Sequence, residues 1–331
     1  MALTTYNSNG SNINSTRNYA YVDPANGDIF IADTYLAGTS GCQVWKYNVR
    51  GDLITTATLD STPSVANLVQ MVALSNGNLC VMWTNNASPS KLFFQILDKT
   101  LLTVVAKTEI DTAGVNPLPN SHIIALSGGG FAVAYCRAGF NSRFTIRDNA
   151  GNVVKAPTDI AGMATPSSGT AAGPRFRLAQ LSNGNIAVAV NETTSSNNLQ
   201  FCIYDTAGNV IVGYTSLTGG VGAISVYPDI AVMNGYFCIA VTGSRAYVVN
   251  NAGTVQGSAI NLTTYNPSSA FSVLSDGTYF WIGLTRISGG FFTLIRISSG
   301  GVEYTLTQIN ASGVTIDVQA RKAAILAGQL N

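Results

Sequence analysis

The chain is a succession of short apolar runs separated by polar turns that contain glycine. The ten residues from Leu74, LSNGNLCVMW, recur almost unchanged from Leu181 as LSNGNIAVAV. Short runs rich in Val, Ile, Phe and Tyr and bounded by Asn-Gly are typical of β-strands joined in hairpins. The pattern therefore predicts an all-β protein built from a repeated hairpin.

The hairpin turn occurs six times. A Gly preceded by Asn, Asp or Gly stands between two apolar runs at spacings of 50, 52, 55, 51 and 42 residues: Gly27, Gly77, Gly129, Gly184, Gly235 and Gly277. These dipeptides favour a two-residue type I′ turn, in which both central residues have positive φ. A period near 50 residues indicates a repeat architecture.

A second turn follows later in each repeat. Asp or Asn opens it and Gly takes a left-handed position before the next run, as at Gly151, Gly208 and Gly253. The second repeat departs from this pattern, because its LDKTLL segment contains no Gly. We therefore expect a different turn there.

The run after each Asn-Gly turn is apolar at successive positions and does not alternate with polar residues. Large residues lie two and four positions after the Gly: Ile29, Leu79, Phe131, Ile186, Phe237 and Tyr279, then Ile31, Val81, Val133, Val188, Ile239 and Trp281. Smaller residues such as Ala132 and Cys80 lie between them. A strand that is apolar on both faces must be covered on both faces.

Each repeat thus contains four strands, and six such repeats predict a six-bladed β-propeller of four-stranded antiparallel blades. A β-solenoid is the runner-up, but its rungs are usually shorter than about 30 residues. Two stacked sandwiches would not explain a sixfold count. We expect a polar N-terminal arm over 1–17 and a C-terminal tail over 311–331, with a closing strand or short helix. The blades are expected at about 18–60, 68–111, 120–161, 174–218, 227–262 and 268–310.

In such blades the Asn-Gly and Asp-x-x-Gly turns fall on one face, and the longer, irregular connections fall on the other. A rigid scaffold with one face of irregular loops is a common way to carry binding, so we expect any binding there. Plain connectors without a role are the alternative. The candidate binding residues on the loop face are Tyr35, Arg137, Phe140, Glu192, Tyr265 and Arg286.

Composition narrows the function classes. Only 10% of the 331 residues are charged, against about 25% in ordinary globular domains, and the net charge is +1. No basic field attracts nucleic acid or an anionic membrane, and no apolar run approaches the roughly 20 residues of a membrane span. The N-terminal MALTTYNSNG lacks the features of a signal peptide. We expect neither nucleic acid nor membrane insertion.

Metal and disulfide chemistry is not expected. The five cysteines are scattered and odd in number, so we interpret Cys42, Cys80, Cys136, Cys202 and Cys238 as small buried hydrophobic residues. His122 is the single histidine and cannot by itself form a zinc site. The DPANGD segment resembles a calcium loop in its two aspartates, but a hairpin turn explains it better. We expect no metal and no cofactor.

Catalytic patterns are weak. A glycosidase needs two carboxylates at a fixed separation, and the only glutamates are Glu109, Glu192 and Glu303. Asp60, Asp111 and Asp159 recur at the end of the outermost strand, where we expect them to cap turns and to lie too far apart to act together. Trp45, Trp83 and Trp281 occupy different positions, so no sugar site repeats per blade. We expect a protein that is not an enzyme.

The paired signature L-S-x-G-x-x-x-V and F-x-I-x-D-x-x-G-N-V, seen over 74–98, 126–154 and 181–211, resembles repeats in bacterial and phage-encoded β-propeller proteins. The composition, rich in Asn, Ser, Thr and Gly, resembles that of a bacteriophage virion component such as a tail or tail-fibre protein. The resemblance implies a structural protein that is made in the host cytoplasm, assembles symmetrically with other virion subunits and meets a host-surface glycan or receptor. A free carbohydrate-binding propeller and a glycan hydrolase or lyase using Glu192 or Asp111 remain the alternatives.

Overall fold

A computed structural model describes residues 19–37, 39–61, 65–85, 90–112, 121–137, 142–162, 175–191, 199–217, 228–241, 245–262, 267–286 and 291–310. These residues form six four-stranded antiparallel sheets, in each of which the strands pair in chain order. Each sheet is called a blade below. The described residues contain no helix, and so no helix among them could cross a membrane. The all-β class and the six four-stranded units expected from the repeat are confirmed.

The chain divides into two compact units, and the first, Met1–Asp159, contains blades 1 to 3. Blade 1 consists of β1 (Tyr19–Val22), β2 (Ile29–Ala37), β3 (Thr39–Tyr47) and β4 (Leu53–Asp60). Blade 2 consists of β5 (Val65–Ala73), β6 (Leu79–Asn85), β7 (Leu92–Leu97) and β8 (Thr103–Glu109). Blade 3 consists of β9 (His122–Ala125), β10 (Phe131–Cys136), β11 (Ser142–Arg147) and β12 (Val153–Asp159).

The second unit, Ile160–Asn331, contains blades 4 to 6. Blade 4 consists of β13 (Arg175–Gln180), β14 (Ile186–Asn191), β15 (Leu199–Tyr204) and β16 (Val210–Leu217). Blade 5 consists of β17 (Pro228–Met233), β18 (Tyr236–Val241), β19 (Arg245–Asn250) and β20 (Val255–Asn261). Blade 6 consists of β21 (Pro267–Ser275), β22 (Phe280–Arg286), β23 (Phe291–Ile297) and β24 (Glu303–Asn310).

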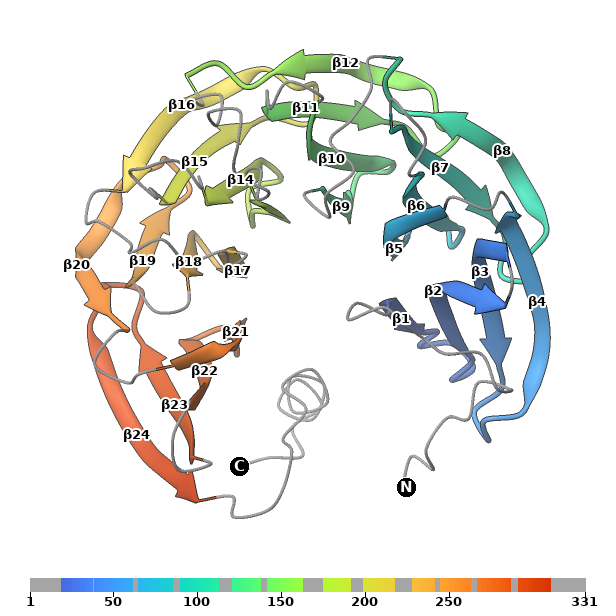
Figure 1. The fold of residues 1–331 in the computed structure, drawn as a ribbon. Helices are drawn as coiled ribbons and strands as arrows, with labels where there is room; N and C mark the ends of the chain where they lie inside the picture. Colours follow the sequence, from blue (N-terminus) through green and yellow to red (C-terminus); the bar gives the residue numbers. More distant parts are fainter. Residues whose placement is uncertain are drawn as a thin grey trace. The chain divides into compact units, whose positions relative to one another are not determined.

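Within each unit the first strands of neighbouring blades lie side by side: β1, β5 and β9 in one, β13, β17 and β21 in the other (Figure 1). Hydrophobic clusters fill the spaces between blades 1 and 2, 2 and 3, 4 and 5, and 5 and 6. Aromatic rings meet across these spaces, as where the centroids of Phe94 and Phe131 lie 5.2 Å apart. Burial of apolar side chains between blades is therefore the main stabilising contact within each unit.

The second strand of a blade is the most deeply buried. Every residue of β10 is buried, whereas β12, the fourth strand of the same blade, is exposed or half-buried throughout. In blades 2 and 5 the second strand packs against a neighbouring blade on each face, which explains the two-sided apolar pattern after the Asn-Gly turn. The fourth strand lies at the free edge of its sheet, as the order in each sheet shows.

The hairpin turns differ from the type I′ form that the Asn-Gly pairs predict. Gly77 has a φ of 86°, but Asn76 is not among the residues of positive φ. The Gly77 amide donates to the Leu74 carbonyl at 2.9 Å, and the Leu74 amide donates to the Asn78 carbonyl at 2.8 Å. This is a three-residue loop, a type I turn closed by a left-handed Gly. The glycines were identified correctly and the turn type was not.

The LDKTLL turn of blade 2 has the same geometry as its counterparts, contrary to expectation. Leu101 takes the glycine position with a φ of 68° and is the only described non-glycine residue of positive φ. Asp98 holds the turn, because its Oδ1 accepts hydrogen bonds from the backbone amides of Thr100 and Leu102 at 2.7 and 3.0 Å. Leu101 is only 6% exposed and packs in the cluster between blades 1 and 2. Packing of the side chain thus offsets the backbone strain.

The sixth blade is shifted by one residue relative to the sequence pattern. Phe280 and Ile282 are fully buried against blade 5, whereas Tyr279 and Trp281, which the spacing places in the core, are half-buried. The first core residue of this strand, Phe280, lies three positions after Gly277, whereas the sequence pattern places the core residue two positions after the turn glycine. Since side chains alternate between faces, a shift of one residue exchanges the two faces of the strand.

Polar contacts join neighbouring blades on the side of the tight turns, which we call the tight-turn side. Nζ of Lys99 lies 2.7 Å from Oδ2 of Asp23, so the second turn of blade 2 is tied to the first turn of blade 1. The same pair of turns is joined by Asn149 and Ser75 between blades 3 and 2, and by Asn251 and Ser182 between blades 5 and 4. DPANGD is a hairpin turn, as expected.

The five cysteines are free and buried, as expected. Burial raises the pKa of Cys136 and of Cys202 to about 12. Both thiols are therefore protonated at neutral pH, and they pack as hydrophobic groups.

Candidate polar site between blades 2 and 3

The opposite side of the blades, called the loop side here, is where second strands end, third strands begin and fourth strands lead to the next blade. In blade 3 the strand ends on this side carry four polar residues across all four strands. Tyr135 pairs with Arg143, and Arg143 pairs with Asp159. Ser121 completes the row, because it precedes His122, whose partner on β10 is Ala134. We call these four residues the strand-end row.

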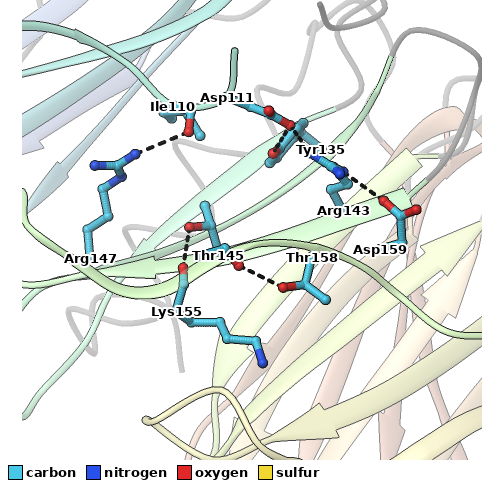
Figure 2. A network of polar contacts seen from close by, with 10 residues as sticks. Ile110, Asp111, Tyr135, Arg143, Thr145, Arg147, Lys155, Thr158 and Asp159 are labelled. Atoms are coloured by element: carbon cyan, nitrogen blue, oxygen red, sulfur yellow. Dashed lines mark hydrogen bonds and ion pairs between the residues drawn. The ribbon is translucent and has the colours of Figure 1, made fainter. Parts of the chain in front are cut away.

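The strand-end row is tied to blade 2 by Asp111, which follows β8. The Tyr135 hydroxyl donates a 2.7 Å hydrogen bond to Oδ2 of Asp111, and Nη1 of Arg143 donates to the same oxygen. Nε of Arg143 donates to Oδ1 of Asp159 at 2.7 Å (Figure 2). One guanidinium thus holds two carboxylates, one from each blade.

The environment fixes the protonation states of the row. Burial, followed by the hydrogen bond and the charge of Asp111, raises the pKa of Tyr135, so the phenol stays neutral at physiological pH. Burial alone would lower the pKa of Arg143, but its hydrogen bonds to Asp159 and Asp111 outweigh burial and raise the pKa. The neutral phenol and the permanent cation hold the two carboxylates in fixed positions. Such an arrangement suits ligand binding better than proton transfer.

A related cluster lies between blades 1 and 2. Nε1 of Trp83 donates to Oδ2 of Asp60 at 3.1 Å, and Nζ of Lys107 lies 2.6 Å from the same oxygen. The Lys107 ammonium also sits 4.3 Å from the centroid of the Phe93 ring. Trp83 occupies the position of Tyr135, six residues after the turn glycine, so the two clusters are variants of one arrangement.

These clusters correct the reading of the aspartates as turn caps. Asp60 and Asp111 are 6% and 7% exposed and accept hydrogen bonds from side chains of the next blade. Asp111 and Asp159 are also not independent of each other, because the Arg143 side chain forms an ion pair with each of them. The sequence places these aspartates at the ends of successive outer strands, which suggests that they are far apart. It does not reveal that the long side chain of Arg143 bridges Asp111 and Asp159.

Gln70 of β5 lies at the inner end of the space between blades 2 and 3. Its Nε2 donates to the Ser121 carbonyl at 2.6 Å, and its Oε1 accepts from the Ile123 amide at 3.0 Å. The half-buried His122 lies between these two backbone contacts. The side-chain amide thus binds the first strand of the next blade where no strand pairs with it.

Blades 4 and 5 have different residues at these positions. Val190 and Val241 stand six residues after their turn glycines and are 1% and 0% exposed. Near the first strands, Asp229 accepts a 2.8 Å hydrogen bond from the Val273 amide, a contact similar to that of Gln70. Blades 4 and 5 therefore lack the aromatic residue with a polar tip that blades 2 and 3 carry at this position.

The residues expected to bind lie around this region or outside the described part of the chain. Arg137 is half-buried and follows Tyr135 by two residues, so it projects from the same face of blade 3. Tyr35 and Arg286 lie in β2 and β22. Phe140, Glu192 and Tyr265 are outside the described residues. Their roles stay predictions.

Sequence reasoning missed Ser121, Tyr135 and Arg143. One signal was available: the sixth residue after the turn glycine is Trp83 or Tyr135 in blades 2 and 3 but valine in blades 4 and 5. A large residue with a polar tip at an otherwise aliphatic buried position indicates a hydrogen-bond partner. Within the part of the chain that the structure describes, no three His, Cys, Asp or Glu side chains gather as a metal site would require.

No family model and no curated protein matches this chain. Among solved structures, the BP39L lectin from Burkholderia pseudomallei is similar with a TM-score of 0.62 and 13% identity, covering 88% of this chain and 83% of the lectin. An ulvan lyase, a polysaccharide lyase bound to a GlcA–Rha3S repeat, has a TM-score of 0.50 and 9% identity, with 88% and 83% covered. The six-bladed Aleuria aurantia lectin has a TM-score of 0.44 and 13% identity, with 90% and 96% covered. The six four-stranded antiparallel sheets, together with the similarity to the BP39L lectin, confirm the fold class, a six-bladed β-propeller.

Proposed function

We propose that this protein is a carbohydrate-binding β-propeller whose ligand binds on the loop side of blades 2 and 3. The strand-end row is the observation that carries the proposal. It places a hydroxyl, a phenol, a guanidinium and a carboxylate in one line across a blade, running from a buried to a half-exposed position. Saccharides present several hydroxyl groups in one plane, each able to donate and to accept, and a fixed line of donors and acceptors complements them.

The neighbouring cluster adds an amphipathic surface. The ammonium group of Lys107 lies over the ring of Phe93. The Lys107 side chain is 36% exposed, so its N–H donors are accessible from solvent. Sugar rings combine hydroxyl groups with apolar C–H faces, so charged donors next to aromatic rings suit them. The similarity to the BP39L lectin supports the proposal as well, since a protein of this architecture is known as a lectin.

The lyase alternative receives less support. It requires Asp111 or Glu192 as a catalytic group, and Asp111 accepts hydrogen bonds from both Tyr135 and Arg143. Both bonds are made to Oδ2 and the residue is only 7% exposed, so the carboxylate is already engaged and has little access to a substrate. The raised pKa of Tyr135 likewise makes its phenolate a costly species.

The placement of this propeller in a phage tail remains a proposal based on composition. A surface glycan of the host would then be the natural ligand of the loop side. Electron microscopy of particles from the native source would test it, since a virion component is found as a symmetric assembly within the particle. A protein that is monomeric and absent from particles would rule the placement out while leaving carbohydrate binding intact.

A glycan array followed by titration calorimetry tests the binding proposal. We expect Asp159→Asn to weaken binding of the selected glycan by about tenfold or more, because a hydrogen bond to a charged group contributes about 1.5–3 kcal/mol. Asp159 suits the test because its side chain is 49% exposed, so the fold tolerates the change. The matched control is Asp52→Asn, whose side chain is 68% exposed on the tight-turn side. Absence of glycan binding, or equal effects of the two variants, would contradict the proposal.

A further inference from the structure

Two buried hydroxyl groups at the loop end of the space between blades 2 and 3 lack a hydrogen-bond partner. They are Oγ1 of Thr84 and Oγ of Ser121, whose residues are 2% and 4% exposed. Neither is paired with any group in the described part of the chain. Native proteins seldom leave buried hydroxyl groups unpaired, so these two call for an explanation such as a bound water, an ion or a ligand.

Both hydroxyl groups belong to the same space. Thr84 alternates along β6 with Cys80 and Met82, which pack in the cluster between blades 2 and 3. Ser121 precedes β9 and alternates with Ile123, which packs in that same cluster from the other side. The two side chains therefore face each other's blade at the loop end of one inter-blade space.

The backbone brings the two residues near each other. Gln70, which binds the Ser121 carbonyl, is paired in register with Met82 of β6. Thr84 lies two residues beyond Met82 on the same face, which places it diagonally across from Gln70 on the loop side. Both hydroxyl groups therefore lie toward the loop end of the same inter-blade space.

The strand-end row leads from solvent to this point. The side chains of Asp159 and Arg143 are 49% and 17% exposed, and Tyr135 and Ser121 are 1% and 4% exposed. Polar groups thus continue without interruption from the rim of blade 3 to the unpaired hydroxyl of Ser121. The charges near the row are balanced, with Arg137 and Arg143 against Asp111 and Asp159.

We propose that this end of the inter-blade space binds a neutral saccharide unit, whose hydroxyl groups pair with Thr84 and Ser121 while its outer edge meets Arg143 and Asp159. The inference rests on the proposed function and specifies its site and ligand class. Sugar hydroxyls donate and accept, so each satisfies a protein hydroxyl in either direction. A neutral ligand fits because balanced charges offer no net attraction to a uronate or sulfate group.

The test separates ligand binding from folding. Thr84→Val keeps the shape of the side chain and removes the unpaired hydroxyl, and Ser121→Ala does so at the other residue. We expect both variants to unfold at a higher temperature than the wild type in the absence of ligand, because an unpaired buried polar group is removed. We expect both to bind the neutral glycan selected on the array at least about tenfold more weakly.

Thr145→Val is the matched control. Thr145 is fully buried in the same blade, but its hydroxyl donates to the Lys155 carbonyl at 2.7 Å (Figure 2). Its loss should lower the unfolding temperature and leave glycan affinity unchanged. In the ligand-free protein, Thr84→Val should raise the unfolding temperature and Thr145→Val should lower it. This difference distinguishes an unpaired hydroxyl from a paired one.

The outcomes are separable. If the wild type binds no glycan, the proposed function and this inference both fail. If it binds a glycan with an affinity that Thr84→Val and Ser121→Ala leave unchanged, the inference fails and the function stands. A lower unfolding temperature for the ligand-free Thr84→Val or Ser121→Ala protein, or preference for acidic over neutral glycans, also overturns the inference.

Discussion

The phenolic hydroxyl of Tyr135 in blade 3 donates a 2.7 Å hydrogen bond to Oδ2 of Asp111, a residue that follows the last strand of blade 2. The two residues are 1% and 7% exposed. The bond therefore joins two blades through polar groups that are almost completely removed from water. It stands at the centre of the strand-end row and supports both its stability and its geometry.

Tyr135→Phe should destabilise the protein by about 1–3 kcal/mol, because Asp111 loses one of its donors inside the protein. Urea unfolding monitored by circular dichroism would measure the loss. The control is Tyr236→Phe, since the hydroxyl of Tyr236 has no hydrogen bond among the described residues. Equal stability of Tyr135→Phe and the wild type would show that the remaining partners of Asp111, Arg143 among them, satisfy its carboxylate.

Acid should weaken the second turn of several blades. Hydrogen bonds from Thr100, Asn152 and Asn209 are the largest cause that lowers the pKa of Asp98, Asp148 and Asp205, respectively. A carboxylate whose pKa is lower in the folded state contributes stability above its unfolded pKa of about 3.9, and that stability is lost as the pH falls through the folded value. The triple Asp→Asn variant should therefore lose less stability than the wild type between about pH 5 and pH 2.5.

Asn250 provides the internal reference for this experiment. It opens the same turn in blade 5, and its Oδ1 accepts from the amides of Ala252 and Thr254 at 3.0 and 2.8 Å. An amide oxygen thus maintains the turn without titrating. Identical acid sensitivity of the triple variant and the wild type would show that the sensitive carboxylates lie outside these three turns.

Two turn glycines should respond very differently to alanine. A Cβ at Gly130 would collide with the carbonyl oxygen of Arg147, whereas a Cβ at Gly184 would meet open space. Both residues have positive φ, 83° and 88°, so both substitutions carry a backbone strain of about 1–2 kcal/mol. Only Gly130→Ala adds overpacking of about 1–3 kcal/mol. Thermal unfolding of the two variants would reveal the difference, and equal shifts would contradict it.

Leu101→Gly should destabilise the protein even though it relieves a positive φ. Relief of the strain contributes about 1–2 kcal/mol, but removal of a buried leucine side chain costs about 2–5 kcal/mol. We expect a net loss of about 1–3 kcal/mol in chemical denaturation. A more stable variant would mean that Leu101 packs poorly between blades 1 and 2.

The five thiols should be inert in the folded protein. All are buried, and burial raises the pKa of Cys136 and Cys202 to about 12, so the reactive thiolate is scarce at pH 8. A thiol-reactive dye should label no cysteine under native conditions and all five after unfolding. Rapid labelling of one cysteine in the folded state would indicate local opening of its blade.

The repeat and the strand pattern could be predicted from the sequence because they depend on local rules. Asn-Gly turns and apolar runs determine where a strand begins and which residues are buried, and every residue of β10 is buried as that pattern requires. Local rules failed where packing competed with them. Leu101 adopts a glycine conformation because its side chain is buried, a fact that the LDKTLL segment alone does not reveal.

The candidate site was harder to predict because it depends on residues distant in sequence. Asp111, Tyr135, Arg143 and Asp159 are separated by up to 48 residues (159 − 111) and meet only when blades 2 and 3 pack together. Each residue alone has an ordinary explanation, as a turn cap or a surface charge. Their common function depends on the register of four strands, and composition and spacing do not determine that register.

The second turn of each blade has a further consequence for evolution. The first residue of this turn accepts a hydrogen bond from the backbone amide four residues later in every blade. It is Asn48, Asp98, Asp148, Asp205, Asn250 or Ser298. Replacing one of these residue types by another changes the charge of that position by at most one unit and preserves the shape of the loop. Selection can therefore tune the electrostatic potential of the tight-turn side gradually, one position at a time, with little penalty in folding.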